Sequence, residues 1–574
     1  MADNSTLAAT DGTGHAASYA INAGDTAWVM ICACLVFIMS PALGLFYAGL
    51  ARAKNALSLM YLTVLSVAVV SFQWYLIGYS LTFSETGSNF IGDSTHFLLR
   101  GVGTKPAFEG QTIPASAFMI FQAMFAAITP ALAFGSAAER MSLGPAILFI
   151  FIWTTLVYDV ITNWVWASNG WLAKLGIMDY AGGIPVHISS GLGAFAYALV
   201  LGKRRDYHKN ANAPHNVTFV FLGLALMWFG WFAFNAGSAL AANARSVNSL
   251  VATHISACTA AIVWVLLDYL KTRKWSIIGL CTGAVAGLAT ITPGSGFVTP
   301  SSALAFGALG SLVCYIAIHY KHKMGIDDCL DVFGVHYVGG LVGLILTGIF
   351  AERAVIALGF PEGTPLDDIP IGGWLDGNWK QVPVQLAGIA AVSIWSFVVT
   401  YIILMVINQV PSLYLRLADE DEIVGTDWAE MGERAYGYLD YEEAEAVTPD
   451  NINGHTLDNS KKQNIHVARL KRLLMIDRST VIRGAPDLVE APVMDYGQQK
   501  DLGAYDLHSL KPPIPSPTNE VIIQNVQVNQ IDDSNSLQHK PTLHHTSSND
   551  DTIQVLSSAN ETPLGSSSNS AKSK

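Results

Sequence analysis

The feature that most constrains this chain is a series of eleven apolar runs, each of about the 20 residues that a helix needs to cross a bilayer. Of the 574 residues, 51% are hydrophobic and only 13% are charged, although the last third is polar. The sequence therefore predicts an all-α membrane protein with eleven transmembrane helices. Their approximate spans are 27–50, 58–83, 115–138, 142–162, 186–202, 216–240, 250–270, 276–292, 303–320, 331–351 and 383–410.

Positive charge is distributed unequally between the loops. The loops after odd-numbered runs carry twelve Lys and Arg residues, the opposite loops carry about half as many, and the first 26 residues carry none. Because Lys and Arg accumulate on the cytoplasmic side, we expect the N-terminus outside the cell and the C-terminus in the cytoplasm. An odd number of helices agrees with this orientation.

Composition divides the chain into four parts. We expect an extracellular segment at 1–26, a transmembrane domain at 27–410, a cytoplasmic tail segment at 411–445 and a largely disordered tail at 446–574, where Ser, Asn, Asp, Gln, Thr and Pro predominate. Asn4 opens an Asn-Ser-Thr glycosylation sequon on the side expected outside. No basic region, short apolar stretch and cleavage site follow one another at the amino terminus, so the first helix is expected to act as its own signal.

Two histidines, His187 and His336, open the same phrase, Val-His-x-x-x-Gly-Leu, in otherwise apolar runs. An isolated buried polar group is costly, and two matched groups can satisfy each other. Ionisable rings at membrane depth also indicate a polar path. The sequence Phe-Asn-Ala-Gly from Phe234 echoes Phe-Tyr-Ala-Gly from Phe46, and both pairs predict an inverted five-plus-five repeat.

Aromatic and acidic residues flank these histidines. Phe121 and Phe125 are four residues apart, so they share one face of a helix and can either plug a pore or pack in the core. Asp179 stands just before a helix start, beside two glycines, and we favour a structural role for it as the helix cap. Most tryptophans near helix ends are expected to be interfacial anchors.

Several other classes of function are disfavoured. The six cysteines show no metal-like clustering, no basic stripe suits nucleic acid, and no nucleophile triad suggests an enzyme. We therefore expect no cofactor, no metal and no nucleic-acid partner.

Taken together, these segments resemble one family, the ammonium transporters, methylammonium permeases and Rhesus proteins. The resemblance spans about residues 20–440, and the sequon and long tail look most like the fungal high-affinity ammonium permeases. The motifs that carry it are Phe-Gln-x-x-Phe-Ala from Phe121, Ala-Glu-Arg from Ala138, Asp-Tyr-Ala-Gly-Gly from Asp179, Phe-Asn-Ala-Gly-Ser from Phe234, and the run from Asp327 to His336.

The resemblance implies a multi-pass homotrimer in the plasma membrane with one pore per subunit. It assigns an outer recruitment site to Phe121, Phe125, Trp166 and Ser238 with Trp231 in support, a pore gate to Phe125 and Phe234, the conduction path to His187 and His336, and a buried structural role to Asp179. In the tail, Asp427, Gly432 and Tyr436 match the fixed points of a regulatory motif. The alternative for this segment is a solvated acidic run.

The expected function is uptake of ammonium or methylammonium as a nitrogen source. Ammonium would be recruited outside, deprotonated near the phenylalanines, and conducted as ammonia along the histidines with separate or shared proton transfer. Two alternatives stay open: a sensor that signals through its tail, and a neutral gas channel of the Rhesus type. A basic patch before Ser479 suggests a regulatory kinase or signalling partner as a further hypothesis.

Overall fold

The computed structural model describes residues 9–10, 16–17, 21–205, 207 and 214–437, all within the first of two units, residues 1–461. The predicted glycosylation of Asn4, the tail at 446–574 and the patch before Ser479 lie outside the described residues. Two short strands, β1 (Ala9–Thr10) and β2 (Ala16–Ala17), pair antiparallel. Every other element is helical, so the predicted all-α class is confirmed.

The helices form two consecutive sets followed by one long helix. The first set contains α1 (Ala23–Leu50), α2 (Ala56–Gln73), η2 (Trp74–Gly78), α3 (Tyr79–Phe83), α4 (Ala115–Ala137), α5 (Leu143–Trp153), η4 (Thr154–Tyr158), α6 (Asp159–Trp166), η5 (Gly183–Ile188) and α8 (Ser189–Leu201). The second contains α9 (Val217–Gly237), α10 (Ala244–Thr272), α11 (Ile277–Ile291), α12 (Pro300–Met324), η6 (Phe333–Tyr337) and α13 (Val338–Phe350). The long helix is α15 (Gln381–Gln409).

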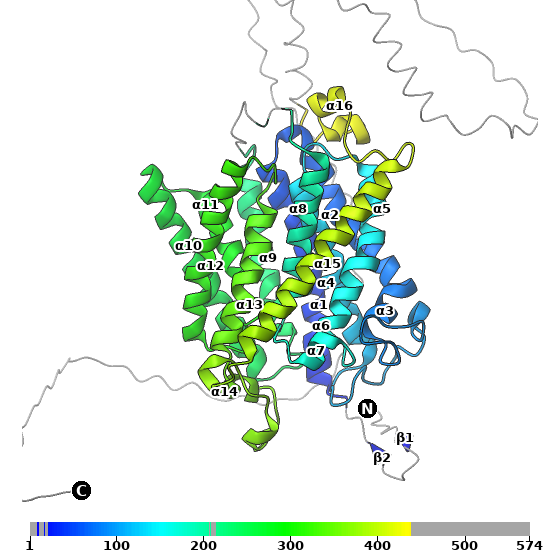
Figure 1. Cartoon of the computed structure of the whole chain (residues 1–574), viewed down its shortest axis with the longest axis vertical. Helices are drawn as coiled ribbons and strands as arrows, with labels where there is room; N and C mark the ends of the chain where they lie inside the picture. Colours follow the sequence, from blue (N-terminus) through cyan, green and yellow to red (C-terminus); the bar gives the residue numbers. More distant parts are fainter. Residues whose placement is uncertain (1–8, 11–15, 18–20, 206, 208–213, 438–574) are drawn as a thin grey trace, which may run out of the picture. The chain divides into compact units, whose positions relative to one another are not determined.

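Short elements lie between and after these helices. They are η1 (Ala53–Asn55), η3 (Phe97–Leu99), α7 (Trp171–Leu175), α14 (Arg353–Ala357), η7 (Leu366–Asp368), η8 (Trp374–Asp376), α16 (Asp419–Val424) and η9 (Asp427–Met431). Figure 1 shows α16 at one end of the helices, and α7 and α14 at the other. We call these the tail end and the N-terminal end.

The length and apolar character of the helices suit a bilayer. Ten helical segments among the described residues are long and apolar enough to cross a membrane, and α11 is a shorter apolar helix of 15 residues. Large apolar side chains are exposed along their flanks, among them Phe72, Phe229, Ile262, Ile316 and Ile394. In water such a surface would be unfavourable, whereas lipid tails cover it at no cost.

Four predicted helices differ from the expected regular form. The helices expected at 58–83 and 142–162 each contain a π-helical segment, η2 and η4, and those expected at 186–202 and 331–351 each begin with one, η5 and η6. A π turn adds one residue to a turn without making the run less apolar, so hydropathy cannot reveal it. Such turns occur frequently at functional sites.

Glycines bring the first helices of the two sets into close contact. A Cβ at Gly49 would lie 2.7 Å from the backbone N of Val220, and one at Gly223 would lie 2.6 Å from the backbone N of Phe46. The start of α9 therefore packs against the end of α1, and the two helices run antiparallel. Small residues allow this approach, which matters where lipid provides no hydrophobic drive between helices.

Candidate functional site

The two matched histidines meet at the centre of the bundle. The Nδ1 atoms of His187 in η5 and His336 in η6 are 3.2 Å apart, and the ring centroids are 5.2 Å apart. Both side chains are buried, at 1% and 5% exposure. This hydrogen bond is the contact expected if the two matched rings satisfy each other.

The glycine in each histidine phrase explains how the two segments approach. A Cβ at Gly191, four residues after His187, would lie 2.5 Å from the backbone N of Tyr337. A Cβ at Gly340, four residues after His336, would lie 3.1 Å from the Cβ of His187. Each Val-His-x-x-x-Gly-Leu motif therefore supplies one histidine, and its glycine leaves space for the segment that carries the other histidine.

An aspartate eight residues before each histidine caps its segment. The carboxylate of Asp179 accepts hydrogen bonds from the backbone N–H groups of Gly182, Gly183 and Ile184 at 2.9, 2.7 and 2.6 Å, as the expected cap requires. Asp328 accepts from the N–H groups of Val332 and Phe333 at 3.1 and 3.0 Å.

The role of Asp328 was missed in the sequence. Both Asp179 and Asp328 lie eight residues before a histidine, and this shared spacing could have predicted the role of Asp328 as a cap. Unlike Asp179, it also faces the buried ammonium group of Lys321, at 3.5 Å.

The hydrogen bond between the two imidazoles leaves one free Nε2 as an acceptor and the other as a donor. When both rings are neutral, one Nδ1 donates to the other, so the donor ring has an accepting Nε2 and the acceptor ring has a donating Nε2–H. The Nε2 of His187 is buried and has no partner among the described residues. The pair thus offers one donor and one acceptor to a small polar molecule.

Aromatic rings close the space on the N-terminal side of the histidines. The ring centroids of Phe125 and Phe234 are 4.1 Å apart, and Phe121 packs edge-on against Phe125 at 4.9 Å. Trp231 stacks on His187 at 5.5 Å, and its Nε1–H donates to the Thr292 hydroxyl at 3.0 Å. Both Phe125 and Phe234 are buried, so no open channel passes between them.

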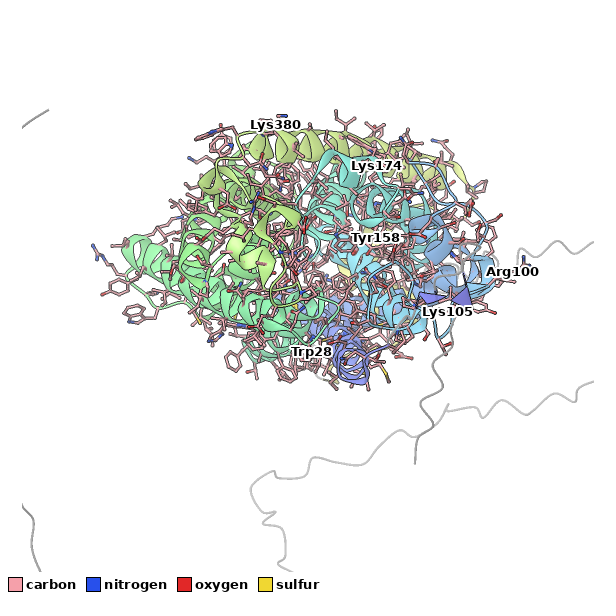
Figure 2. The ribbon with its side chains drawn as sticks, turned by 90° about the horizontal axis from the view of Figure 1, so that it is seen from below. Trp28, Arg100, Lys105, Tyr158, Lys174 and Lys380 are labelled. Atoms are coloured by element: carbon pink, nitrogen blue, oxygen red, sulfur yellow. The ribbon has the colours of Figure 1, made fainter. Side chains whose placement is uncertain are left out.

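One cavity lies on each side of this pair of rings. The inner cavity, of about 90 Å³, is lined by His187, His336, Phe234, Trp231 and mostly apolar side chains that continue to Leu50 and Asp331 at the tail end. The outer cavity, of about 860 Å³, opens at the N-terminal end and is lined by Trp166 and Ser238 among others. The view from that end in Figure 2 shows Lys380, which also lines this cavity, at the rim.

The predicted outer residues converge between the outer cavity and the phenylalanine rings. Trp166 lies 5.9 Å from Phe125 between centroids, and its Nε1–H donates to the carbonyl of Asp179 at 3.0 Å. The Ser238 hydroxyl donates to the carbonyl of Phe234 at 2.9 Å. Because its hydrogen is engaged, the lone pairs of the Ser238 oxygen remain available to accept a hydrogen bond from a ligand.

A buried charged network lies at the tail end, and its ion pairs were not predicted from the sequence. Glu139, at the end of α4, pairs with Arg52 at 2.7 Å and Arg204 at 2.9 Å, and Arg204 also pairs with Asp327 at 2.7 Å. Burial alone would raise the pKa of Glu139, but the two guanidinium groups lower it below its usual value. The network joins the loop ends of both helix sets.

The tail segment packs against this end of the bundle. The Asp427 carboxylate accepts from the N–H groups of Leu57 and Ser58 at 2.9 and 2.8 Å, at the start of α2, and burial raises its pKa. The Tyr436 hydroxyl lies 2.9 Å from Nε2 of His215. Gly432 ends η9 with a φ of +69°, a conformation that favours glycine. A fully solvated acidic run does not account for these contacts.

Comparisons with known proteins agree with this arrangement. A family model described as Ammonium Transporter Family matches residues 27–436. Ammonium transporter 1 of Schizosaccharomyces pombe is 49% identical over 419 residues, covering 73% of this chain and 83% of the relative. Ammonium transporter MEP2 of Saccharomyces cerevisiae is 43% identical over 436 residues, covering 75% and 85%. The crystal structure of Candida albicans Mep2 aligns with a TM-score of 0.67 and 40% identity, covering 78% of this chain and 96% of that one.

Proposed function

The chain belongs to the ammonium transporter family, and on this basis we propose that it takes up ammonium by recruiting NH4+ at the outer cavity and conducting ammonia past the histidine pair. The observation that carries the proposal is the position of His187 and His336, buried and hydrogen-bonded directly beneath the Phe125–Phe234 rings. The named relatives are ammonium transporters, which supports the substrate.

In this proposal the N-terminal end faces the outside and the tail end faces the cytoplasm. The excess of Lys and Arg in the tail-end loops supports that orientation. We place the protein in the plasma membrane, where uptake of external nitrogen requires it. The charged network around Glu139 would then line the cytoplasmic side.

Recruitment would use aromatic faces and one hydroxyl. A small cation facing aromatic rings gains about 0.5 to 2 kcal/mol. Trp166 and Phe121 supply the rings, with Trp231 in support deeper in the pathway, and the Ser238 oxygen is available to accept a hydrogen bond from ammonium. This site alone does not separate ammonium from potassium, which is a cation of similar size.

Selectivity would arise at the Phe125–Phe234 gate. Even low estimates for a charge at mid-membrane are about 2.5 kcal/mol or more, which exceeds what the outer site returns. Ammonium can give up a proton and cross as neutral ammonia, whereas potassium cannot. The inner cavity is lined mostly by apolar side chains, and its two imidazoles suit a small neutral molecule with hydrogen-bond donors and an acceptor.

The histidine pair would guide ammonia and relay the proton. Its free Nε2 atoms are one donor and one acceptor, which match the two hydrogen-bonding functions of ammonia. The donor ring would take up a proton at its free Nε2, pass its Nδ1 hydrogen to the other Nδ1, and the other ring would release its Nε2 hydrogen. One proton then passes along the pair, and the two rings exchange roles without a rearrangement of the backbone. Asp179 would hold the first histidine segment in place through its three backbone bonds.

The assembly and the tail form the regulatory part of the proposal. We propose a homotrimer with one pore per subunit, as the family resemblance implies. Asp427, Gly432 and Tyr436 would couple the tail to α2 and to the loop before α9, and the bonds of Asp427 and Tyr436 support this. A kinase or signalling partner acting on the tail, and a sensing role beside transport, would work through the same contacts.

The test is transport by the full-length protein in liposomes. Ammonium should evoke a current and an internal pH change, and potassium should evoke no current. His187→Ala and His336→Ala should each reduce the ammonium current about a hundredfold, the low side of what a positioned proton-transfer group contributes. His254→Ala, which alters an exposed histidine on α10, is the matched control. Full current and unchanged selectivity in both pore variants would refute the relay, and a pH change without current would indicate a neutral ammonia channel.

A further inference from the structure

A second ionisable group is buried at membrane depth, away from both cavities. Asp159 is the first residue of α6, is 0% exposed, and lines neither the inner nor the outer cavity. It takes part in none of the ion pairs found among the described residues. Gln73, at the end of α2, donates a hydrogen bond to it from Nε2 to Oδ2 at 2.7 Å, and the Thr82 hydroxyl also lies beside the carboxyl group.

The amide of Gln73 is held in a defined orientation. One N–H donates to Asp159, and the other donates to the Thr155 hydroxyl at 3.0 Å. The Thr155 hydroxyl donates its own hydrogen to the carbonyl of Phe151 at 2.9 Å, so toward Gln73 it is an acceptor. The nitrogen of the amide must therefore face these two oxygens. Two oxygens are left buried without a partner, Oε1 of Gln73 and Oδ1 of Asp159.

A single proton would give both of these oxygens a hydrogen-bond partner. If Asp159 is ionised, both oxygens are acceptors, neither can bond the other, and the buried charge has no counter-ion. A proton on Oδ1 converts that atom into a donor, and the amide to which Asp159 is already bonded carries the unpartnered acceptor Oε1. We propose that Asp159 binds a proton and holds it as a neutral carboxylic acid, which forms a closed acid–amide pair with Gln73.

The surroundings of Asp159 contain no charge that would stabilise the ionised form. The polar side chains beside it are Thr82 from α3, Tyr158 and Thr155 from η4, and Thr162 and Asn163 from α6, all uncharged at neutral pH. The sequences of α2, η2, α3, α4, α5 and α15 contain no Asp, Glu, Lys, Arg or His. Two further elements pack against α6. In η5 the one titratable group is His187, whose Nδ1 is engaged by His336, and in α7 it is Lys174, whose side chain is exposed.

The backbone departs from regular α-helical geometry beside both Gln73 and Asp159. The π-helical segment η2 begins immediately after Gln73, and η4 ends immediately before Asp159. A Cβ at Gly78 would lie 2.4 Å from Oε1 of Gln73, so glycine there leaves room for the amide oxygen. Figure 2 shows Tyr158, the neighbour of Asp159, among the helices and away from the rim. The proton thus locks α2 to α6 where both helices depart from regular geometry.

Infrared spectroscopy of the full-length protein in liposomes at pH 7 tests the protonation directly. The wild-type minus Asp159→Asn difference spectrum should contain one carboxylic-acid C=O band that shifts in D2O. Asp368→Asn, at an exposed position in η7, should leave that band in place. Loss of ionised-carboxylate bands in the Asp159→Asn spectrum, with no acid band, would overturn the proposal in favour of a bound cation.

Substitutions test the pairing. Asn can both accept from and donate to the Gln73 amide, so Asp159→Asn should fold, transport ammonium at the wild-type rate and keep its melting temperature. Asp159→Leu and Gln73→Leu should each lower the melting temperature by about 2 to 4 °C, because each leaves a buried polar group without its partner. If Asp159→Asn is destabilised as much as Asp159→Leu, or fails to fold, the acid–amide pair is wrong. The infrared and melting outcomes do not depend on whether the pore conducts ammonia.

Discussion

The two histidine segments, η5 and η6, have the same arrangement of aspartate, histidine and glycine, but different groups stabilise their caps. In each, an aspartate eight residues before the histidine caps the segment, and a glycine four residues after it admits the other half. Asp179 relies on three backbone N–H groups, whereas Asp328 has two and also faces Lys321. The comparison teaches that the inverted repeat preserves the geometry of the histidines, while each end of the bundle stabilises its cap with the groups available there.

The largest expected effect is at the cap that has no cation. Asp179→Ala leaves three buried N–H groups without an acceptor, at about 1 to 3 kcal/mol each, so we expect about 3 to 9 kcal/mol of destabilisation. Asp179→Asn keeps one accepting oxygen, which can still serve Gly182 and Gly183, and should lose less. Melting temperature in detergent at one scan rate measures both variants. Equal losses for Ala and Asn would contradict this account of the cap.

The second-largest effect is expected from removal of Lys321, the cation that the first histidine segment lacks. Lys321 is buried and also pairs with Asp331 at 2.5 Å, so Lys321→Met leaves the carboxylate of Asp328 without a cation. We expect a loss on the order of 3 kcal/mol, typical of a buried ion pair deprived of one partner. The exposed Lys323→Met is the matched control and should melt like the wild type. A Lys321→Met variant that is as stable as the control would show that backbone bonds suffice at both caps.

The smallest effect is expected at the glycines of the two segments, Gly191 and Gly340. A Cβ at Gly191 would lie 2.5 Å from a backbone nitrogen, which cannot move aside, whereas the nearest atom to a Cβ at Gly340 is 3.0 Å away. Gly191→Ala should therefore cost more than Gly340→Ala, within the range of about 1 to 3 kcal/mol for overpacking. Gly144→Ala, in open space on α5, serves as the control. Stability and ammonium current should rank the three variants in the same order, and a reversed ranking of the two pore glycines would count against the described contact.

The sequence alone predicted much of the fold, because its physical signals are local. Apolar runs of membrane length, the repeated histidine phrase and the position of Asp179 before a helix start were each readable within a few tens of residues. The tertiary contacts agree with the expected cap and with the histidine pairing. The functional roles assigned to Phe121, Phe125, Trp166, Trp231, Phe234 and Ser238 stay predictions, although the structure brings these residues together.

Other features depend on contacts between distant segments and could not be predicted in this way. The four π-helical segments within the expected membrane helices leave hydropathy unchanged, and the network around Glu139 joins four loops. The orphaned oxygens of Gln73 and Asp159 become evident only when α2 and α6 are placed together. The sequence by itself determined the membrane class and the matched halves, since burial in lipid selects long apolar helices. Only the tertiary structure decided which polar groups meet, because hydrogen bonds reach about 3 Å and link residues that the sequence separates by up to several hundred positions.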